Sequence, residues 1–284
     1  MTFSTPDIRQ ALDPAQWKRH RWGTPLRRLN FLRDRTFWIT GAGTGYGQSI
    51  AFMLASIGAT VFMTGRRAEK LEDTRQLMLS HGIKTDSVHA LAADITDPVQ
   101  AAAACEHIAR HSPCLDGIVH SAALPQATPG LTPLMEGELA HWERIMRTNV
   151  TAPWHLTRLI TPHLLKSDAI RILFLTSEAG WADTPGHGQY NISKSALNNL
   201  TMSLAAEFAI SHPELDVQIN ALIPGEAKTE MNQGSEVSPF SIVEMTILLL
   251  SHPAGGPNGY FFHKDGRHFD FAYRAAYQKS LRLA

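Results

Sequence analysis

The chain lacks several features that would narrow its class at once. It has only two cysteines in 284 residues, Cys105 and Cys114, so no disulfide framework is expected. Its 26 basic and 26 acidic residues balance, which gives no overall sign of binding to nucleic acid or an anionic membrane. No apolar run approaches the roughly 20 residues that span a bilayer, and no signal-peptide hydrophobic region is visible. We expect a soluble cytoplasmic protein.

Two kinds of site are also missing from the pattern. The 14 histidines are scattered apart from one HxxxH pair, His107 and His111, and there is no CxxC, so no metal site is expected. There is no GxSxG motif with histidine and aspartate partners, which argues against a serine hydrolase.

From residue 35 onward, strand and helix patterns alternate. Short apolar runs predict seven strands, at residues 36–40, 60–64, 88–92, 117–120, 170–176, 217–223 and 259–263. Continuous apolar strands joined by helices are typical of a parallel sheet that is covered on both faces. The expected fold class is therefore α/β: a doubly wound Rossmann-type fold with a seven-stranded parallel sheet and helices on both faces.

We expect one catalytic domain, at residues 35–267, with an extension at each end. The N-terminal extension, 1–34, interleaves basic residues with Trp17 and Trp22, and is interpreted as an arm packed on the domain or across a subunit interface. A basic patch for an anionic partner is the alternative. The C-terminal tail, 268–284, is aromatic and either packs on the domain or covers a neighbouring subunit's pocket.

A glycine-rich turn follows the first predicted strand. It reads Thr40-Gly41-Ala42-Gly43-Thr44-Gly45-Tyr46-Gly47 and leads directly into a helix that is expected to end before Gly58. Glycines permit a tight turn and let a pyrophosphate approach the backbone, while the helix N-terminus supplies N–H donors. The sequence thus predicts a site for a dinucleotide.

Tyr190 and Lys194 form a second pattern, with Ser177 thirteen residues upstream of the tyrosine. If the segment is helical, both side chains lie on one face. An ammonium beside a phenol favours the phenolate, so we expect Lys194 to lower the pKa of Tyr190. Such a tyrosine can exchange a proton with an alcohol or carbonyl oxygen.

The TGxxxGxG turn, together with Asn149, Ser177, Tyr190 and Lys194, closely resembles the short-chain dehydrogenase/reductase family over residues 35–266. The resemblance implies hydride transfer between NAD(P) and a carbonyl/alcohol pair. It implies that Ser177 binds the substrate oxygen, that Tyr190 is the general acid/base and that Lys194 lowers its pKa and holds the nicotinamide ribose. Asn149 would hold a water that relays protons from Lys194.

The same resemblance implies a set of cofactor-binding positions. Pro224, Gly225 and Thr229 match the segment that reaches the nicotinamide amide, and Asp94 would contact the adenine. The full expected set is Gly41, Thr44, Gly45, Tyr46, Gly47, Arg66, Arg67, Asp94, Ile95, Ser121, Ala122, Tyr190, Lys194, Pro224, Gly225 and Thr229.

The end of the second strand bears on the choice of dinucleotide. Gly65 stands where NAD-dependent relatives carry an acidic residue, and Arg66 and Arg67 follow it. An arginine can make charge-assisted bonds to a 2′-phosphate and stack on adenine. We expect NADP(H). The alternative is that both arginines begin a solvated helix and pair with Glu69.

Two segments depart from the family pattern. After the fourth strand, His120-Ser121-Ala122-Ala123 replaces the usual Asn-Asn-Ala-Gly, and His120 would brace the sheet through a ring N–H. Between Pro224 and a helix near Ser241, the usual helical lid is replaced by a short polar stretch. A short lid leaves the pocket open for a bulky or carrier-attached substrate, unless the arm or tail covers it.

The substrate itself is not identified by the sequence. Weak candidates for substrate contact are Glu178, Trp181 and His187, in the loop between Ser177 and Tyr190. A 3-oxoacyl thioester reductase is one alternative, and a regulatory protein that senses NADP(H) without turnover is another. The resemblance also implies a homodimer or homotetramer, built on the helices after Glu138 and Tyr190.

Overall fold

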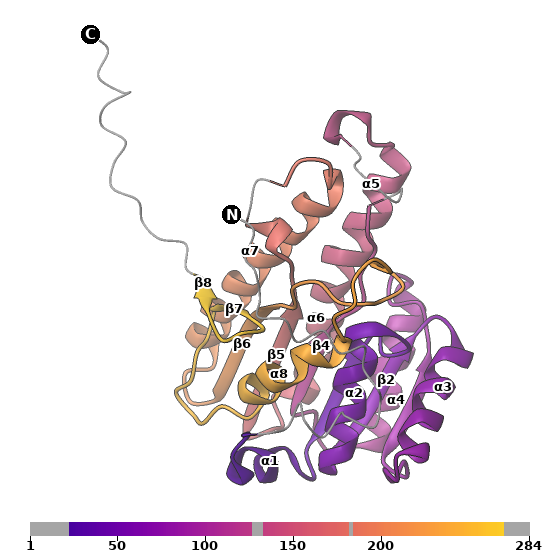
Figure 1. Cartoon of the computed structure of the whole chain (residues 1–284). Coiled ribbons are helices and arrows are strands. Elements are labelled where there is room, and N and C mark those ends of the chain that lie inside the picture. The colour runs from indigo at the N-terminus through magenta and orange to yellow at the C-terminus, as the bar shows by residue number, and fades with distance from the viewer. Residues whose placement is uncertain (1–22, 127–132, 182–183, 270–284) are drawn as a thin grey trace.

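A computed structural model describes residues 23–126, 133–181 and 184–269, and it has the expected α/β architecture (Figure 1). One sheet has the strand order β3-β2-β1-β4-β5-β6-β7-β8. The seven parallel strands that the sequence predicts are confirmed. They are β1 (Thr36–Thr40), β2 (Thr60–Gly65), β3 (Val88–Ala92), β4 (Gly117–His120), β5 (Ala169–Leu175), β6 (Asp216–Ile223) and β7 (Phe261–His263).

An additional short strand, β8 (His268–Phe269), pairs antiparallel with β7 at the edge of the sheet. The sequence analysis missed it because two residues are too few to show a periodic pattern. β8 lies at the start of the segment that we assigned to the C-terminal tail. The aromatic residues of the tail from 271 onward lie outside the described residues.

Helices cover both faces of the sheet (Figure 1). α2, α3 and α8 pack on one face, and α4, α6 and α7 on the other. The α-helices are α1 (Leu26–Leu32), α2 (Gly45–Ile57), α3 (Ala68–Ser80), α4 (Pro98–His111), α5 (Leu139–Met146), α6 (Ala152–Leu164), α7 (Gly188–Ser211) and α8 (Val243–Leu250). Short turns are η2 (Leu134–Glu136), η4 (Glu178–Gly180) and η5 (Pro239–Ile242), and a π-helical turn, η3 (Arg147–Thr151), joins α5 to α6. No helix in these described ranges is long and apolar enough to cross a membrane.

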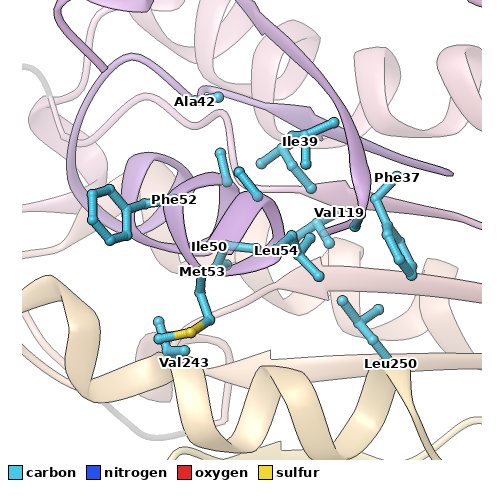
Figure 2. Close-up of a cluster of buried hydrophobic side chains, with 14 of the residues drawn as sticks. Phe37, Ile39, Ala42, Ile50, Phe52, Met53, Leu54, Val119, Val243 and Leu250 are labelled. Atoms are coloured by element: carbon cyan, nitrogen blue, oxygen red, sulfur yellow. The ribbon is translucent and has the colours of Figure 1, made fainter. Parts of the chain in front are cut away.

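The two hydrophobic clusters follow from the alternation of side chains along buried strands. Phe37 and Ile39 of β1 face the cluster with α2 and α8, whereas Trp38 between them faces the cluster with α4 and α6. Figure 2 shows the first cluster, where Met53 and Leu54 of α2 lie between the strands and α8. α2 ends as expected at Gly58, which adopts a left-handed conformation (φ 96°).

The described part of the N-terminal extension packs on the domain. Leu32 of α1 is fully buried, and Arg28 Nη1 donates a hydrogen bond to the carbonyl of Ser251 at 2.5 Å. For residues 23–34 this agrees with our interpretation of an arm on the domain surface. The rest of the arm, with Trp17 and Trp22, lies outside the described residues.

A buried carboxylate ties the amino ends of β1, β4 and β5 together. Asp116 accepts hydrogen bonds from the backbone N–H of Thr36 at 2.7 Å, from Arg35 Nη1 at 2.8 Å and from Ser167 Oγ at 2.6 Å. Arg35 Nη1 also contacts Asp168 at 2.8 Å. Both carboxylates thus contact the same arginine, but the side chain of Asp116 is 8% exposed and that of Asp168 is 82% exposed.

We expect Asp116→Ala to lower the free energy of unfolding by about 2–4 kcal/mol, because buried donors then lose their acceptor. Asp168→Ala is the matched control and should cost less than about 1 kcal/mol, because an exposed ion pair is screened by water. Urea denaturation of both variants measures the difference. Equal losses would show that Asp116 does not hold the strand ends together.

Candidate active site

The glycine-rich turn between β1 and α2 has the geometry that its sequence predicts. Gly41 and Gly45 have positive φ values of 67° and 58°, which other residues adopt only with strain. A Cβ on Gly47 would lie 2.3 Å from the carbonyl oxygen of Gly41, so this position also requires glycine. α2 begins at Gly45 with Thr44 as its N-cap, and no side chain caps the helix. The first N–H groups of α2 therefore remain available to an anion.

A cavity of about 570 Å³ extends along the carboxyl edge of the sheet over this turn. Most of the expected cofactor-binding residues line it: Gly41, Thr44, Gly45, Tyr46, Arg66, Arg67, Asp94, Ile95, Ser121, Ala122 and Thr229. Gly47, Pro224, Gly225, Tyr190 and Lys194 do not line this cavity. A cavity of this size, lined by an uncapped helix N-terminus and by arginines, fits a dinucleotide.

The cationic end of the cavity lies where β2 meets α3. Arg66, Arg67 and Lys70 line it there. Arg67 forms a bidentate ion pair with Glu230, with nitrogen–oxygen distances of 3.2 and 2.6 Å. Arg67 thus pairs with Glu230 and not with Glu69, as the alternative had it. Opposite, the carboxylate of Asp94 accepts hydrogen bonds from the N–H and hydroxyl of Thr96.

Ser177, Tyr190 and Lys194 come together beyond the carboxyl end of β5. The Ser177 hydroxyl lies close enough to the Tyr190 phenol to lower its pKa, and Ser177 Oγ accepts a hydrogen bond from the N–H of Ala179 at 3.1 Å. Tyr190 and Lys194 lie on one face of α7, as the spacing predicts, with Lys194 Nζ 5.5 Å from the centre of the phenol ring. Nζ donates to the carbonyl oxygen of Leu175 at 2.8 Å, which fixes the lysine to the end of β5.

The pKa of Tyr190 shifts in the opposite direction to our sequence-based expectation. Burial raises it to about 12, and the nearby Ser177 hydroxyl only partly opposes this effect. Burial lowers the pKa of Lys194 to about 8. The expectation failed because removing a phenolate from water costs more here than a lysine at this distance restores. Tyr190 is therefore a neutral phenol at neutral pH, which is the form that donates a proton.

Asn149 lies in the π-helical turn η3, and its side chain is fully engaged. Its Oδ1 accepts from the N–H of Leu124 at 2.7 Å, while Nδ2 donates to the carbonyl of Leu124 at 2.9 Å and to Ser193 Oγ at 3.0 Å. Asn149 thus fixes the loop after β4 to α7, within one residue of Lys194. π-helical turns of this kind are frequent at functional sites.

His120, which replaces the usual asparagine, does brace the fold. Its Nε2 lies 2.9 Å from the hydroxyl of Thr157 on α6, and its ring stacks on Phe174 at 4.7 Å. Burial lowers its pKa to about 3, so the imidazole is neutral. Next to it, Gly41 packs so closely on Ala122 that a Cβ on Gly41 would lie 2.8 Å from the Ala122 backbone. This contact sets the floor of the cavity.

The three weak substrate candidates have different surroundings. Glu178 lies 3.4 Å from Nε2 of the buried His263, and the bond lowers the pKa of Glu178 and raises that of His263. Trp181 packs edge-on against Phe261 at 4.7 Å. His187 is the residue before α7. Of these three candidates, Glu178 is thus the one that contacts a titratable side chain, His263, at the carboxyl end of β7.

Sequence reasoning missed several residues at this site. Lys70, Arg144, Arg147 and Glu230 line the cavity, and His263 contacts Glu178. Arg144 and Arg147 are three residues apart and so share one helix face, a spacing that could have drawn attention to them. Glu230 and His263 reach the site through contacts with residues far away in the chain, and such contacts produce no local pattern in the sequence. Across the part of the chain that the structure describes, no group of three or more His, Cys, Asp or Glu side chains is arranged to hold a metal ion.

The buried Lys194 predicts a pH dependence of stability. In the unfolded chain a lysine keeps its proton to about pH 10, whereas the folded chain releases it near pH 8. The unfolded state then binds more protons between these values, so the free energy of unfolding rises with pH by up to about 3 kcal/mol. We expect Lys194→Met to remove this rise.

Urea denaturation of both proteins from pH 7 to 9.5 measures the effect. Lys84→Met, at an exposed position, is the matched control and should keep the slope of the parent. A Lys194→Met variant with the same pH slope as the parent would contradict the shifted pKa.

Comparison with known proteins agrees with this geometry. The sequence model of the short chain dehydrogenase family matches residues 35–238. The oxidoreductase YciK of Escherichia coli K12 is 30% identical over 202 residues, which cover 71% of this chain and 77% of that protein. Gluconate 5-dehydrogenase of Gluconobacter oxydans is 28% identical over 69% of this chain and 72% of its own length.

Solved structures show the same fold. A short chain dehydrogenase of Escherichia coli CFT073 complexed with NADPH superposes with a TM-score of 0.75 at 27% identity, over 83% of this chain and 98% of that chain. A short chain dehydrogenase of Shigella flexneri 2a complexed with NADP gives a TM-score of 0.74 at 27% identity, over 84% and 99%. With its glycine turn and the Ser177, Tyr190 and Lys194 group in place, this chain belongs to the short-chain dehydrogenase family of oxidoreductases.

Proposed function

We propose that this protein is an NADP(H)-dependent oxidoreductase that transfers a hydride between nicotinamide and a carbonyl or secondary alcohol. The observation that carries the proposal is the grouping of Ser177, Tyr190 and the buried Lys194, with Tyr190 close enough to Tyr46 in the wall of the dinucleotide-sized cavity to affect the pKa of Tyr46. The bound dinucleotide would supply or accept the hydride. The residues of the chain would bind the substrate oxygen and move its proton.

Each of the three residues has a separate role in this mechanism. Ser177 and Tyr190 would together hold the carbonyl oxygen of a substrate through their two hydroxyl groups. Tyr190, neutral at neutral pH, donates its proton to that oxygen as negative charge develops there. The positive charge of Lys194 then favours the resulting phenolate, and its bond to Leu175 keeps it in place.

The choice of NADP(H) rests on Arg66. It lines the cavity directly after β2, and among the residues whose positions are described it has no ion-pair partner. A guanidinium held free beside the end of a nucleotide groove suits a 2′-phosphate. Two structural relatives bind NADP or NADPH, which supports the same choice.

A wide substrate entrance is part of the proposal. The stretch between β6 and η5 contains no helix, so the helical lid of the family is absent there, as the sequence predicts. This favours a bulky or carrier-attached substrate, of which a 3-oxoacyl thioester is one example. Whether the arm or the tail covers the entrance involves residues 1–22 and 270–284, which lie outside the described part. A homodimer or homotetramer remains a prediction.

We expect Tyr190→Phe to lower kcat/KM at least about a hundredfold, because the variant loses its proton donor. The measurement is NADPH oxidation with ketones, aldehydes, diketones and oxoacyl thioesters. NADPH affinity should stay within about twofold of the parent, because the phenol ring is retained. Tyr260→Phe, at an exposed position, is the control and should keep parental activity. Tight NADPH binding by a parent that turns over nothing in the panel would favour the sensor alternative.

We expect Arg66→Ala to weaken NADPH binding about ten- to a hundredfold and to leave NADH binding within about twofold, because only NADPH carries the 2′-phosphate. Nucleotide fluorescence titration measures both affinities. Arg110→Ala, on the exposed end of α4, is the control for the loss of an arginine. A preference for NADPH that survives Arg66→Ala would contradict this role of Arg66.

A further inference from the structure

The bidentate ion pair between Arg67 and Glu230 joins the two sides of the nucleotide cavity. Arg67 precedes α3, and Glu230 lies 163 residues later, in the stretch between β6 and η5. Both residues line the cavity. The side chains are 50% and 52% exposed, so the pair is hydrated and can open at small energetic cost.

Glu230 places a carboxylate where the proposed cofactor needs a cation. Both terminal nitrogens of Arg67 are taken by the two oxygens of Glu230. The positive charges of Arg67 and Lys70 also hold the pKa of Glu230 below its usual range, through the Arg67 hydrogen bond first and charge attraction second. The carboxylate is therefore ionised, and it neutralises one of the two arginines at this end of the cavity.

We propose that Glu230 competes with the 2′-phosphate of NADP(H) for Arg67 and so acts as a specificity-determining residue. This inference rests on the proposed use of NADP(H). A 2′-phosphate and a carboxylate can each accept two hydrogen bonds from a guanidinium. The two anions repel each other when they lie beside the same arginine. The phosphate then binds to Arg66 first, and it recruits Arg67 only when Glu230 leaves.

Displacement of Glu230 would also release the segment that carries it. Thr229, the preceding residue, packs against the glycine turn, and a Cβ on Gly45 would lie 3.1 Å from the Thr229 methyl group. Met231, the next residue, lines the cavity. NADPH, with its 2′-phosphate, would therefore loosen the segment beside the proposed substrate entrance, whereas NADH, which lacks the 2′-phosphate, would leave the segment fixed.

The test uses the full-length chain with 2′,5′-ADP, which carries the 2′-phosphate, and with ADP, which does not. Glu230→Gln should tighten 2′,5′-ADP binding about three- to tenfold, because one repulsive charge beside the phosphate is gone. ADP binding should change less than twofold. Calorimetric titration at low and constant salt measures both, and Glu230→Ala checks that a residual bond from the glutamine amide does not hide the effect.

Two controls make the test specific. Glu236→Gln removes a carboxylate from the same segment that pairs instead with Lys228 at 3.6 Å, and it should leave 2′,5′-ADP binding unchanged. In an Arg67→Ala background, Glu230→Gln should give less than a twofold gain, because the two anions no longer share a cation.

Three results would overturn the inference. Equal tightening of ADP and 2′,5′-ADP would show that Glu230 acts on the nucleotide as a whole. Weaker binding of both would show that the ion pair closes over the nucleotide instead of competing with it. A parent that binds 2′,5′-ADP tightly, with no gain in Glu230→Gln, would reject the inference alone; a parent with no preference for 2′,5′-ADP over ADP would reject the NADP(H) proposal as well.

Discussion

The structure depends on a direct backbone contact between the turns that follow β1 and β4. Gly41 has no side chain, which lets its backbone approach that of Ala122. The hydroxyl of Thr40 accepts hydrogen bonds from the N–H groups of Ser121 and Ala122 at 3.1 and 3.2 Å, which holds the two turns in register. This contact forms the floor of the cavity and fixes the N-terminus of α2 above it. A side chain at Gly41 would separate the turns and open the carboxyl edge of the sheet where the site is built.

The sequence predicts the elements that local patterns determine. Seven apolar strands, the glycine turn and the helix with Tyr190 and Lys194 can all be read from periodicity, and the structure has them. It does not predict contacts between segments far apart in the chain. Glu230 reaches Arg67, and Glu178 reaches His263, only because β6 and β7 end at the same edge as β2 and β5. Residue spacing cannot predict these long-range contacts, because they depend on the strand order of the whole sheet.

The Tyr190 pKa illustrates a different limit. A lysine four residues away predicts a lowered pKa if only the charge is considered, but burial acts on both groups and favours the neutral form of each. The extent of burial follows from the packing of α7 on β6 and η4, which the motif alone does not contain. The motif therefore identifies the groups of the proposed mechanism, whereas the surrounding packing sets their protonation.

The stretch after β6 shows how a segment without a helix is positioned. Each part of it is held by a polar contact: the Gly225 carbonyl by the Tyr46 hydroxyl at 2.8 Å, the Lys228 N–H by the Val237 carbonyl at 2.7 Å, and Glu230 by Arg67. A helical lid would be stabilised by apolar burial, which is insensitive to charge. Polar contacts respond to any anion that enters the cavity. Under the proposed function, the short lid would link the position of the substrate entrance to the charge of the nucleotide beside it.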